Sequence, residues 1–100
     1  MYENKGLIKV FNGEKFKTVS YKHENGTITF TTSSKSHKYK YFTSTKKINV
    51  LETDGEKTYD VKLIEDEAQV DTMFSELKAD KIIPFFIPRK NKIVVQYQVK

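Results

Sequence analysis

The sequence predicts a mainly β protein, a small antiparallel barrel of six or seven strands with one clear α-helix near residues 66–80. Three observations support this fold class. Apolar and polar side chains alternate with period 2 through much of the chain, as in half-buried strands. Turn signals such as Asn-Gly separate the alternating segments. Only residues 66–80 carry apolar side chains at clear helical spacing.

The first half predicts a meander of three antiparallel strands. Asn12-Gly13 and Asn25-Gly26 are expected to form tight turns, because both residue types tolerate positive φ. These turns would join strands at residues 6–11, 15–23 and 27–32. In the first strand Leu7 and Val10 are expected to face inward, and in the third strand Ile28 and Phe30 share one face.

The second half predicts two helices and further strands. A serine among residues 33–36 is expected to cap a short helix that buries Tyr39 and Phe42. Strands are predicted at residues 46–51, 58–64 and 92–99. Residues 82–91 are expected to form an extended edge or a loop restricted by two prolines. The helix at 66–80 would pack on the sheet and close one end of the barrel. Its apolar face comprises Val70, Met73, Phe74 and Leu77.

Length and composition limit the function classes. One hundred residues allow one domain, 1–100, with a modest core. The absence of cysteine excludes disulfides, a thiolate nucleophile and a thiolate metal site. Two histidines are too few to predict a histidine metal site, so none is assigned. No signal-peptide pattern is present, and the longest apolar run, residues 82–88, is too short for a bilayer. We therefore expect a soluble, cytoplasmic protein with no membrane contact.

Charge is uneven along the chain. Residues 1–50 contain ten lysines and three glutamates, a balance of +7, whereas residues 51–100 contain eight basic and ten acidic side chains, a balance of −2. Five lysines and no carboxylate lie within residues 35–47. A concentrated positive charge attracts an anion, either a phosphate, a nucleic acid or an acidic protein. A solvated, lysine-rich face is the simpler alternative.

The chemistry available to the protein alone is limited. The sequence has no Gly-x-Ser-x-Gly nucleophile elbow, P-loop or dinucleotide-binding glycine pattern. An enzyme built from this chain would therefore depend on a cofactor, and no catalytic residue is assigned. Hydroxyl and lysine side chains are concentrated in residues 31–42, TTSSKSHKYKYF, where a strand is expected to lead into a helix. Free N–H groups at a helix start, hydroxyls and lysine charge together suit a phosphate monoester.

Several segments occur in an order typical of one known family. Lys17-Thr18-Val19 lies on the second strand, "ITFTT" forms the third, and Thr32 to Lys38 follow as Thr-x-x-x-Ser-x-Lys. Phe42 and the basic strand "KKINV" come next. Over roughly residues 6–70 this order resembles the flavin-binding split-barrel family that includes pyridoxamine 5′-phosphate oxidase.

The resemblance implies a split barrel, usually a homodimer, that binds flavin mononucleotide (FMN) near the dimer interface and acts as an oxidoreductase. Carried over by position, three residues would line the flavin ring and ribityl chain: Lys17, Thr18 and Val19. Thr31 and Thr32 would lie near the ring or ribityl chain, and Ser36, His37 and Lys38 would hold the phosphate. The arginine-containing motif and tryptophan at the C-terminus of the oxidase itself are absent, so the resemblance does not imply that activity, and the substrate and electron donor stay open.

Two other function classes remain. A small basic barrel could bind single-stranded nucleic acid if Tyr39, Tyr41 and Phe42 stacked on bases beside Lys38 and Lys40. Alternatively, the barrel could have lost the cofactor and serve as an interaction module. Burial of the three aromatic rings would exclude the first alternative, and flavin binding would exclude the second.

Overall fold

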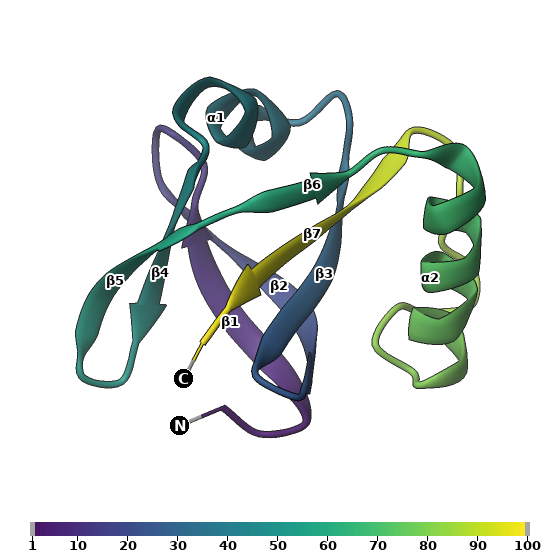
Figure 1. Cartoon of the computed structure of the whole chain (residues 1–100), viewed down its shortest axis with the longest axis horizontal. Helices are drawn as coiled ribbons and strands as arrows, with labels where there is room; N and C mark the ends of the chain where they lie inside the picture. Colours follow the sequence, from purple (N-terminus) through teal and green to yellow (C-terminus); the bar gives the residue numbers. More distant parts are fainter. Residues whose placement is uncertain (1, 100) are drawn as a thin grey trace.

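The computed structural model describes residues 2–99 as one antiparallel sheet with two helices (Figure 1). The seven strands have the order β5-β4-β1-β2-β3-β7-β6 in the sheet. This confirms the predicted mainly β class and adds the bounds of each element. They are β1 Lys5–Phe11, β2 Phe16–Glu24, β3 Thr27–Ser33, α1 His37–Thr45, β4 Lys47–Glu52, β5 Gly55–Asp60, β6 Lys62–Ile64, α2 Glu67–Ala79 and β7 Lys92–Gln98.

The sheet curls because its two edge strands are consecutive in the chain. Only Val61 separates β5 from β6, so the two edges of the sheet must lie close together. Figure 1 shows β5 continuing into β6 as one ribbon, with β6 alongside its partner β7. The Tyr59 ring of β5 stacks on the Tyr97 ring of β7, with 4.9 Å between centroids. The single strand predicted at residues 58–64 is therefore wrong, because the chain changes neighbours at Val61, pairing first with β4 and then with β7.

The sheet opens between β2 and β3. β1 pairs with β2 along seven residues, and β3 pairs with β7 along seven. By contrast, the recorded pairs between β2 and β3 are only Lys22–Thr29, His23–Ile28 and Glu24–Thr27. Toward α1 the two strands diverge, so one stretch of each strand edge has no strand partner within residues 2–99. This divergence splits the barrel wall.

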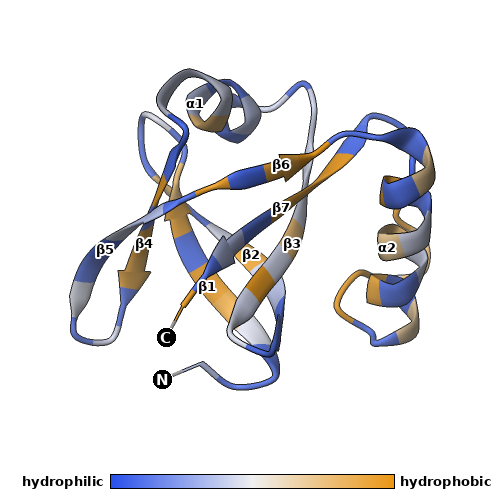
Figure 2. Ribbon diagram, in the orientation of Figure 1, coloured by the Kyte–Doolittle hydropathy of each residue, from blue (hydrophilic) through white to orange (hydrophobic). Residues whose placement is uncertain are grey.

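The core fills the inside of the curled sheet. Its buried side chains come from β1, β2, β3, β4, β7 and α1: Val10, Tyr21, Ile28, Phe30, Phe42, Ile48, Val50, Ile93, Val95 and Tyr97. Figure 2 shows the same division by hydropathy, with hydrophobic stretches in β4 and β7 and a largely hydrophilic β5. The inward position predicted for Val10 is thus confirmed, and Ile28 and Phe30 share a face, as predicted, which is the buried one. Leu7 is not inward: its side chain is 69% exposed, because it lies an odd number of residues from Val10 and so on the opposite face.

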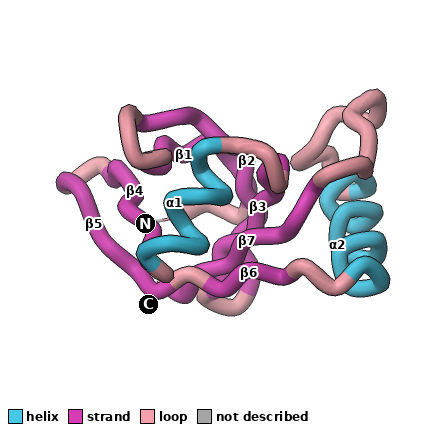
Figure 3. Tube along the Cα trace, turned by 90° about the horizontal axis from the view of Figure 1, so that it is seen from above, coloured by secondary structure: helices cyan, strands magenta, loops and turns pink. Residues whose placement is uncertain are grey.

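Of the two helices, α2 takes a place different from the one expected. α1 lies across one end of the barrel, as the view from above shows (Figure 3), and inserts the fully buried Phe42 into the core. α2 stands beside the barrel, against β7, rather than closing an end. Within α2, Val70, Phe74 and Leu77 are buried as predicted, whereas Met73 is only half-buried. Neither helix is long and apolar enough to cross a membrane.

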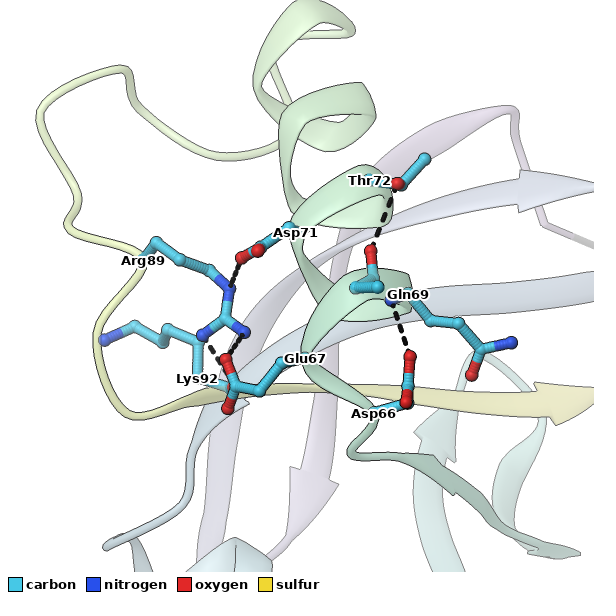
Figure 4. Close-up of polar contacts among 8 residues, drawn as sticks. Asp66, Glu67, Gln69, Asp71, Thr72, Arg89 and Lys92 are labelled. Carbon is cyan, nitrogen blue, oxygen red and sulfur yellow. Dashed lines mark hydrogen bonds and ion pairs between the residues drawn. The ribbon is translucent and has the colours of Figure 1, made fainter.

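An ion-pair cluster joins the loop after α2 to the first turns of that helix. The Arg89 guanidinium contacts the Asp71 carboxylate at 2.6 Å and the Glu67 carboxylate at 2.7 Å (Figure 4). Arg89 also donates a hydrogen bond to the Lys92 carbonyl. The ion pairs of Arg89 therefore fix the C-terminal end of the loop, and the buried side chains of Ile82 and Ile83 fix its N-terminal end.

Candidate functional site

The start of α1 lies where β3 ends. Ser36 is the N-cap: its hydroxyl accepts a hydrogen bond from the Tyr39 N–H at 3.2 Å and donates one to the Ser33 carbonyl at 2.8 Å. The Thr32 and Ser36 hydroxyls are 3.1 Å apart. The N–H groups of His37 and Lys38 precede the first bonds within the helix, and no acceptor for them is recorded among residues 2–99.

Two lysines converge beside this helix start. Lys17 comes from the inner face of β2, where it lies opposite the buried Val10. Lys38 is in the first turn of α1 and is half-buried. Burial, together with the nearby positive charge of Lys17, lowers the pKa of the Lys38 ammonium group. No carboxylate within residues 2–99 forms an ion pair with either lysine. The two positively charged ammonium groups therefore lie near each other without a neutralising acidic partner.

The opening between β2 and β3 supplies the other half of the site. Val19 is half-buried and packs against the barrel core at this opening. The diverging strand edges leave backbone N–H and C=O groups free to bond a planar polar molecule. An apolar side chain beside a polar strand edge, with cations at one end, suits an anionic ligand that carries a flat ring system.

The eight predicted site residues divide between the two faces of the sheet. Lys17, Val19 and Thr32 lie on the inner face or at its rim, with Ser36 and Lys38 above them on α1. Thr18 and Thr31 lie on the outer face, because their neighbours in each strand point inward. His37 is exposed. The structure thus brings five of the eight together, and the hydroxyl of Ser36 is already engaged as the cap.

The aromatic residues of the same segment are tied into the protein. Phe42 is fully buried and meets the Phe30 ring edge to face. The Tyr39 hydroxyl donates to the Glu65 carboxylate at 2.6 Å. The Tyr41 ring packs edge to face on Phe11, with 5.4 Å between centroids. These rings act as anchors for α1, and stacking on nucleic-acid bases would require them to be free.

Two surface hollows lie elsewhere. One of about 550 Å³ is lined by residues near the turn after β2 and the end of α2, including Lys22, His23 and Asn25. A second, of about 250 Å³, adjoins it at Lys5 and Lys81. The Lys22 ammonium group already pairs with the Asp80 carboxylate at 2.7 Å, which joins α2 to the barrel. Since the Lys22 charge in the larger of these two hollows is compensated, we place the candidate site at the opening between β2 and β3.

Sequence reasoning missed a tyrosine network at the end of the barrel opposite α1. The Tyr2 and Tyr59 hydroxyls both donate to the Glu52 carboxylate at 2.6 Å, and the Tyr2 and Tyr97 hydroxyls are 3.0 Å apart. Burial and the bond to Glu52 raise the pKa of Tyr59 to about 12, and burial raises the pKa of Tyr97. No sequence motif marks these residues, which come together only in the folded barrel. Among residues 2–99, His, Asp and Glu form no group of three or more that could hold a metal ion.

Comparison with known proteins bears on the fold. No family model matches the sequence, and no curated protein matches it significantly. Solved structures do match. A Listeria innocua protein assigned as a pyridoxamine 5′-phosphate oxidase has a TM-score of 0.64 and 14% identity, covering 98% of this chain and 85% of its own. An F420 reductase has a TM-score of 0.64 and 13% identity, covering 96% and 86%.

The chain has the split-barrel fold. General Stress Protein 26 from Bacillus anthracis shares this split barrel, with a TM-score of 0.56 and 15% identity over 98% of this chain and 81% of that one. These matches confirm the fold that the sequence resemblance implied. At 13–15% identity they establish the fold alone, and the chemistry of the split barrel must be argued from its site.

Proposed function

We propose that this split barrel binds FMN, with the phosphate beside Lys17 and Lys38 and the flavin ring along the opening between β2 and β3. The observation that carries the proposal is the half-buried Lys38 next to Lys17 with no carboxylate paired to either. A buried cation beside a like charge is costly unless an anion compensates it. A phosphate monoester carries the charge and the acceptor oxygens to do so.

The residues at hand fit the parts of this cofactor. The Lys38 ammonium and the free N–H groups of His37 and Lys38 would donate to phosphate oxygens, and Lys17 would add a second charge. Thr32 lies between the phosphate corner and the strand opening, where its hydroxyl suits the ribityl chain. Val19 would pack on the ring, and the free strand edges of β2 and β3 would bond its polar rim. Ser36 contributes as the cap that holds α1 in place.

Thr18 and Thr31 would contribute through their backbone at the strand opening, because their side chains face outward. His37, which is exposed, would reach the phosphate through its N–H group. Bound FMN would supply the electron-transfer chemistry that this chain's own side chains lack. The protein's part is to bind the phosphate, orient the ring and exclude water from its inner face. We infer from this a flavin-dependent oxidoreductase that is cytoplasmic and homodimeric.

The F420 reductase and the assigned pyridoxamine 5′-phosphate oxidase that share the fold support this class of function. Single-stranded nucleic acid binding is not favoured, since Tyr39, Tyr41 and Phe42 are engaged within the protein. A barrel without cofactor remains the contrasting case, and a ligand titration separates the two.

The test is a titration of purified protein with FMN and, in parallel, with riboflavin, which lacks the phosphate, followed by flavin fluorescence. We expect saturable binding of one FMN per chain, at least about tenfold tighter than riboflavin, the equivalent of one charge-assisted contact. Lys40→Ala, on the exposed side of α1, is the matched control and should bind as the wild type does. Equal affinity for both flavins, or no binding, would contradict the proposal.

A further inference from the structure

A short apolar segment of the loop after α2 is left exposed by the fold. Residues 84–88, Pro-Phe-Phe-Ile-Pro, follow the buried Ile82 and Ile83 and are called the Phe loop below. Within it, the side chains of Phe85 and Phe86 are 86% and 71% exposed, and their rings meet edge to face with 5.9 Å between centroids. An exposed apolar patch of this kind usually marks an interaction site.

The Phe loop is held in this exposed position by its surroundings. Ile87 packs against the buried cluster that includes Phe74 and Leu77 of α2. The Lys78 ammonium group donates a hydrogen bond to the Phe85 carbonyl at 3.1 Å. A proline at each end of the Phe loop restricts the backbone further. A loop that is ordered before it binds loses little conformational entropy on binding.

Lysines without an acidic partner surround the Phe loop. Lys81 precedes the loop and Lys90 follows it; both are exposed, and neither forms an ion pair within residues 2–99. Lys81 also lines a hollow of about 250 Å³ with Lys5 and the exposed Leu7 of β1. There the Lys5 ammonium group contacts the Asp80 carbonyl at 3.3 Å. The surface beside the Phe loop is therefore positively charged and partly apolar.

The acidic side chains nearby face basic partners within the protein. Arg89 pairs with Glu67 and Asp71 of α2. The hydrogen bond to Asp80 and the neighbouring acidic charges raise the pKa of Lys22. The acids that face Lys22 are Asp80, Glu24 and Glu76. Negative charge is thus gathered around Arg89 and Lys22, and the lysines beside the Phe loop are left to attract an anionic partner.

We propose that the Phe loop binds the surface of a membrane that contains anionic lipid. The rings of Phe85 and Phe86 would enter the boundary between the lipid headgroups and the acyl chains. Lys5, Lys81 and Lys90 would contact lipid phosphates, and each lysine would strengthen binding by about fivefold at low ionic strength. Stable attachment to a membrane surface needs both kinds of contact, because two buried rings or a few lysines alone bind only weakly.

The shape of the Phe loop favours a lipid surface over a protein partner. Figure 3 shows the loop after α2 at the outer margin of the molecule, on the side of β1 and β2 and away from β6. Phe85 and Phe86 line neither of the two hollows. A protein would need a pocket matched to two protruding rings, whereas a fluid membrane interface accepts them without one. Surface binding requires no membrane-spanning segment, so this proposal replaces the expectation of no membrane contact.

The test is co-sedimentation of the full chain, without flavin, with vesicles of phosphatidylcholine alone or of phosphatidylcholine and phosphatidylglycerol in equal parts. We expect binding to the mixed vesicles that weakens as salt is added, and little binding to phosphatidylcholine alone. Phe85→Ser/Phe86→Ser should weaken binding by at least about tenfold. Its unfolding midpoint should stay close to the wild-type value, because both side chains are exposed. No binding to the mixed vesicles, or equal binding by this variant, would overturn the proposal.

Charge reversal separates the Phe loop from the positive net charge of the whole chain. Lys81→Glu/Lys90→Glu should weaken binding to the mixed vesicles by at least about tenfold. Lys40→Glu/Lys62→Glu is the matched control, because it changes the net charge by the same amount at exposed positions on α1 and β6. It should weaken binding by less than about threefold. Equal losses in the two variants would show that net charge drives the binding and that the proposed surface is wrong.

A fluorescent reporter tests whether the Phe loop itself enters the membrane. The chain contains no tryptophan, so Phe86→Trp places a single indole on the loop. Its emission should shift to shorter wavelength when mixed vesicles are added, and lipids with brominated acyl chains should quench it. Lys62→Trp on β6 should show neither change. A shift that follows protein concentration instead of lipid would place the loop against another protein chain, and it would overturn the proposal. FMN binding is independent of each outcome, because no residue of the candidate site is altered.

Discussion

Replacing Lys38 by methionine should raise the stability of the cofactor-free protein and lower its affinity for FMN. Methionine keeps the length of the side chain and removes the charge. Burial and Lys17 lower the folded-state pKa of Lys38 below its unfolded value. The charged form therefore destabilises the folded protein at neutral pH, and this cost fades only as the pH rises from the folded-state pKa past the unfolded value. Lys38→Met removes the cost, so the unfolding midpoint should increase.

The loss of FMN affinity follows from the contact that the lysine is proposed to make. A hydrogen bond to a charged group contributes about 1.5–3 kcal/mol. Because Lys38 is only half-buried, we take the lower part of this range, about 1.5–2 kcal/mol, which corresponds to roughly a 10–30-fold weaker complex. Riboflavin lacks the phosphate, so its affinity should change by less than about twofold, and the preference for FMN over riboflavin should fall by roughly 10–30-fold.

The assay combines thermal unfolding with titrations of FMN and riboflavin, and Lys40→Met on the same helix is the control. Lys40 is exposed, so its substitution should leave the unfolding midpoint and both affinities close to the wild-type values. If Lys38→Met destabilises the protein, the charge is compensated by a group not considered above. If FMN affinity is unchanged, or falls equally with that of riboflavin, the phosphate does not bind at Lys38.

Three further predictions concern the frame around the site. Phe42→Ala should destabilise the protein by about 3–5 kcal/mol in denaturant unfolding, since the ring is fully buried between α1 and the barrel; a loss below about 1 kcal/mol would show that α1 is not anchored there. The raised pKa of Tyr59, about 12, means that its network stabilises the fold fully below its unfolded pKa and that this contribution is lost as the pH rises toward about 12. When the free energy of unfolding is measured near about pH 8 and again near about pH 11, the decrease between the two should be smaller for Tyr59→Phe than for the wild type. Equal decreases would refute this prediction. Asp80→Ala should cost at most about 1 kcal/mol, because both side chains of its pair with Lys22 are partly exposed to solvent. A larger loss in the same unfolding assay would mean that this pair stabilises the fold more than a surface ion pair does.

Most of the secondary structure could be predicted from the sequence because its signals are local. Alternating apolar residues gave β1, β2, β3, β4 and β7, and the serine cap gave α1, because these patterns reflect contacts between near neighbours. The exchange of partners at Val61 had no such signal, since "TYDVKLI" alternates without interruption. Which edge of the sheet each half joins is decided by contacts far away in the chain. Leu7 was misassigned because apolar residues lie on both faces of this strand, and the sequence pattern alone does not say which face is buried.

In the candidate site, too, the features set by local sequence could be predicted and those set by distant contacts could not. The segment from Thr32 to Lys38 was identified from its hydroxyls and lysine, which lie within one strand-to-helix junction. The family resemblance assigned Lys17 to the flavin ring and ribityl chain rather than to the phosphate, and the proximity of Lys17 to Lys38 is seen only in the folded chain. The outward direction of Thr18 and Thr31 could have been read from the alternation, because Val19 and Thr32 occupy the inward positions.

The measurement that tests the proposed site most directly is the change in backbone amide chemical shifts when FMN is added to isotope-labelled protein. We predict that the largest changes fall on His37 and Lys38, with further changes at Thr32 and along β2 near Val19. Largest changes around Lys22 and Asn25, at the hollow beside α2, would place the ligand at the other end of the barrel. That result, or a spectrum unchanged by FMN, would contradict the account.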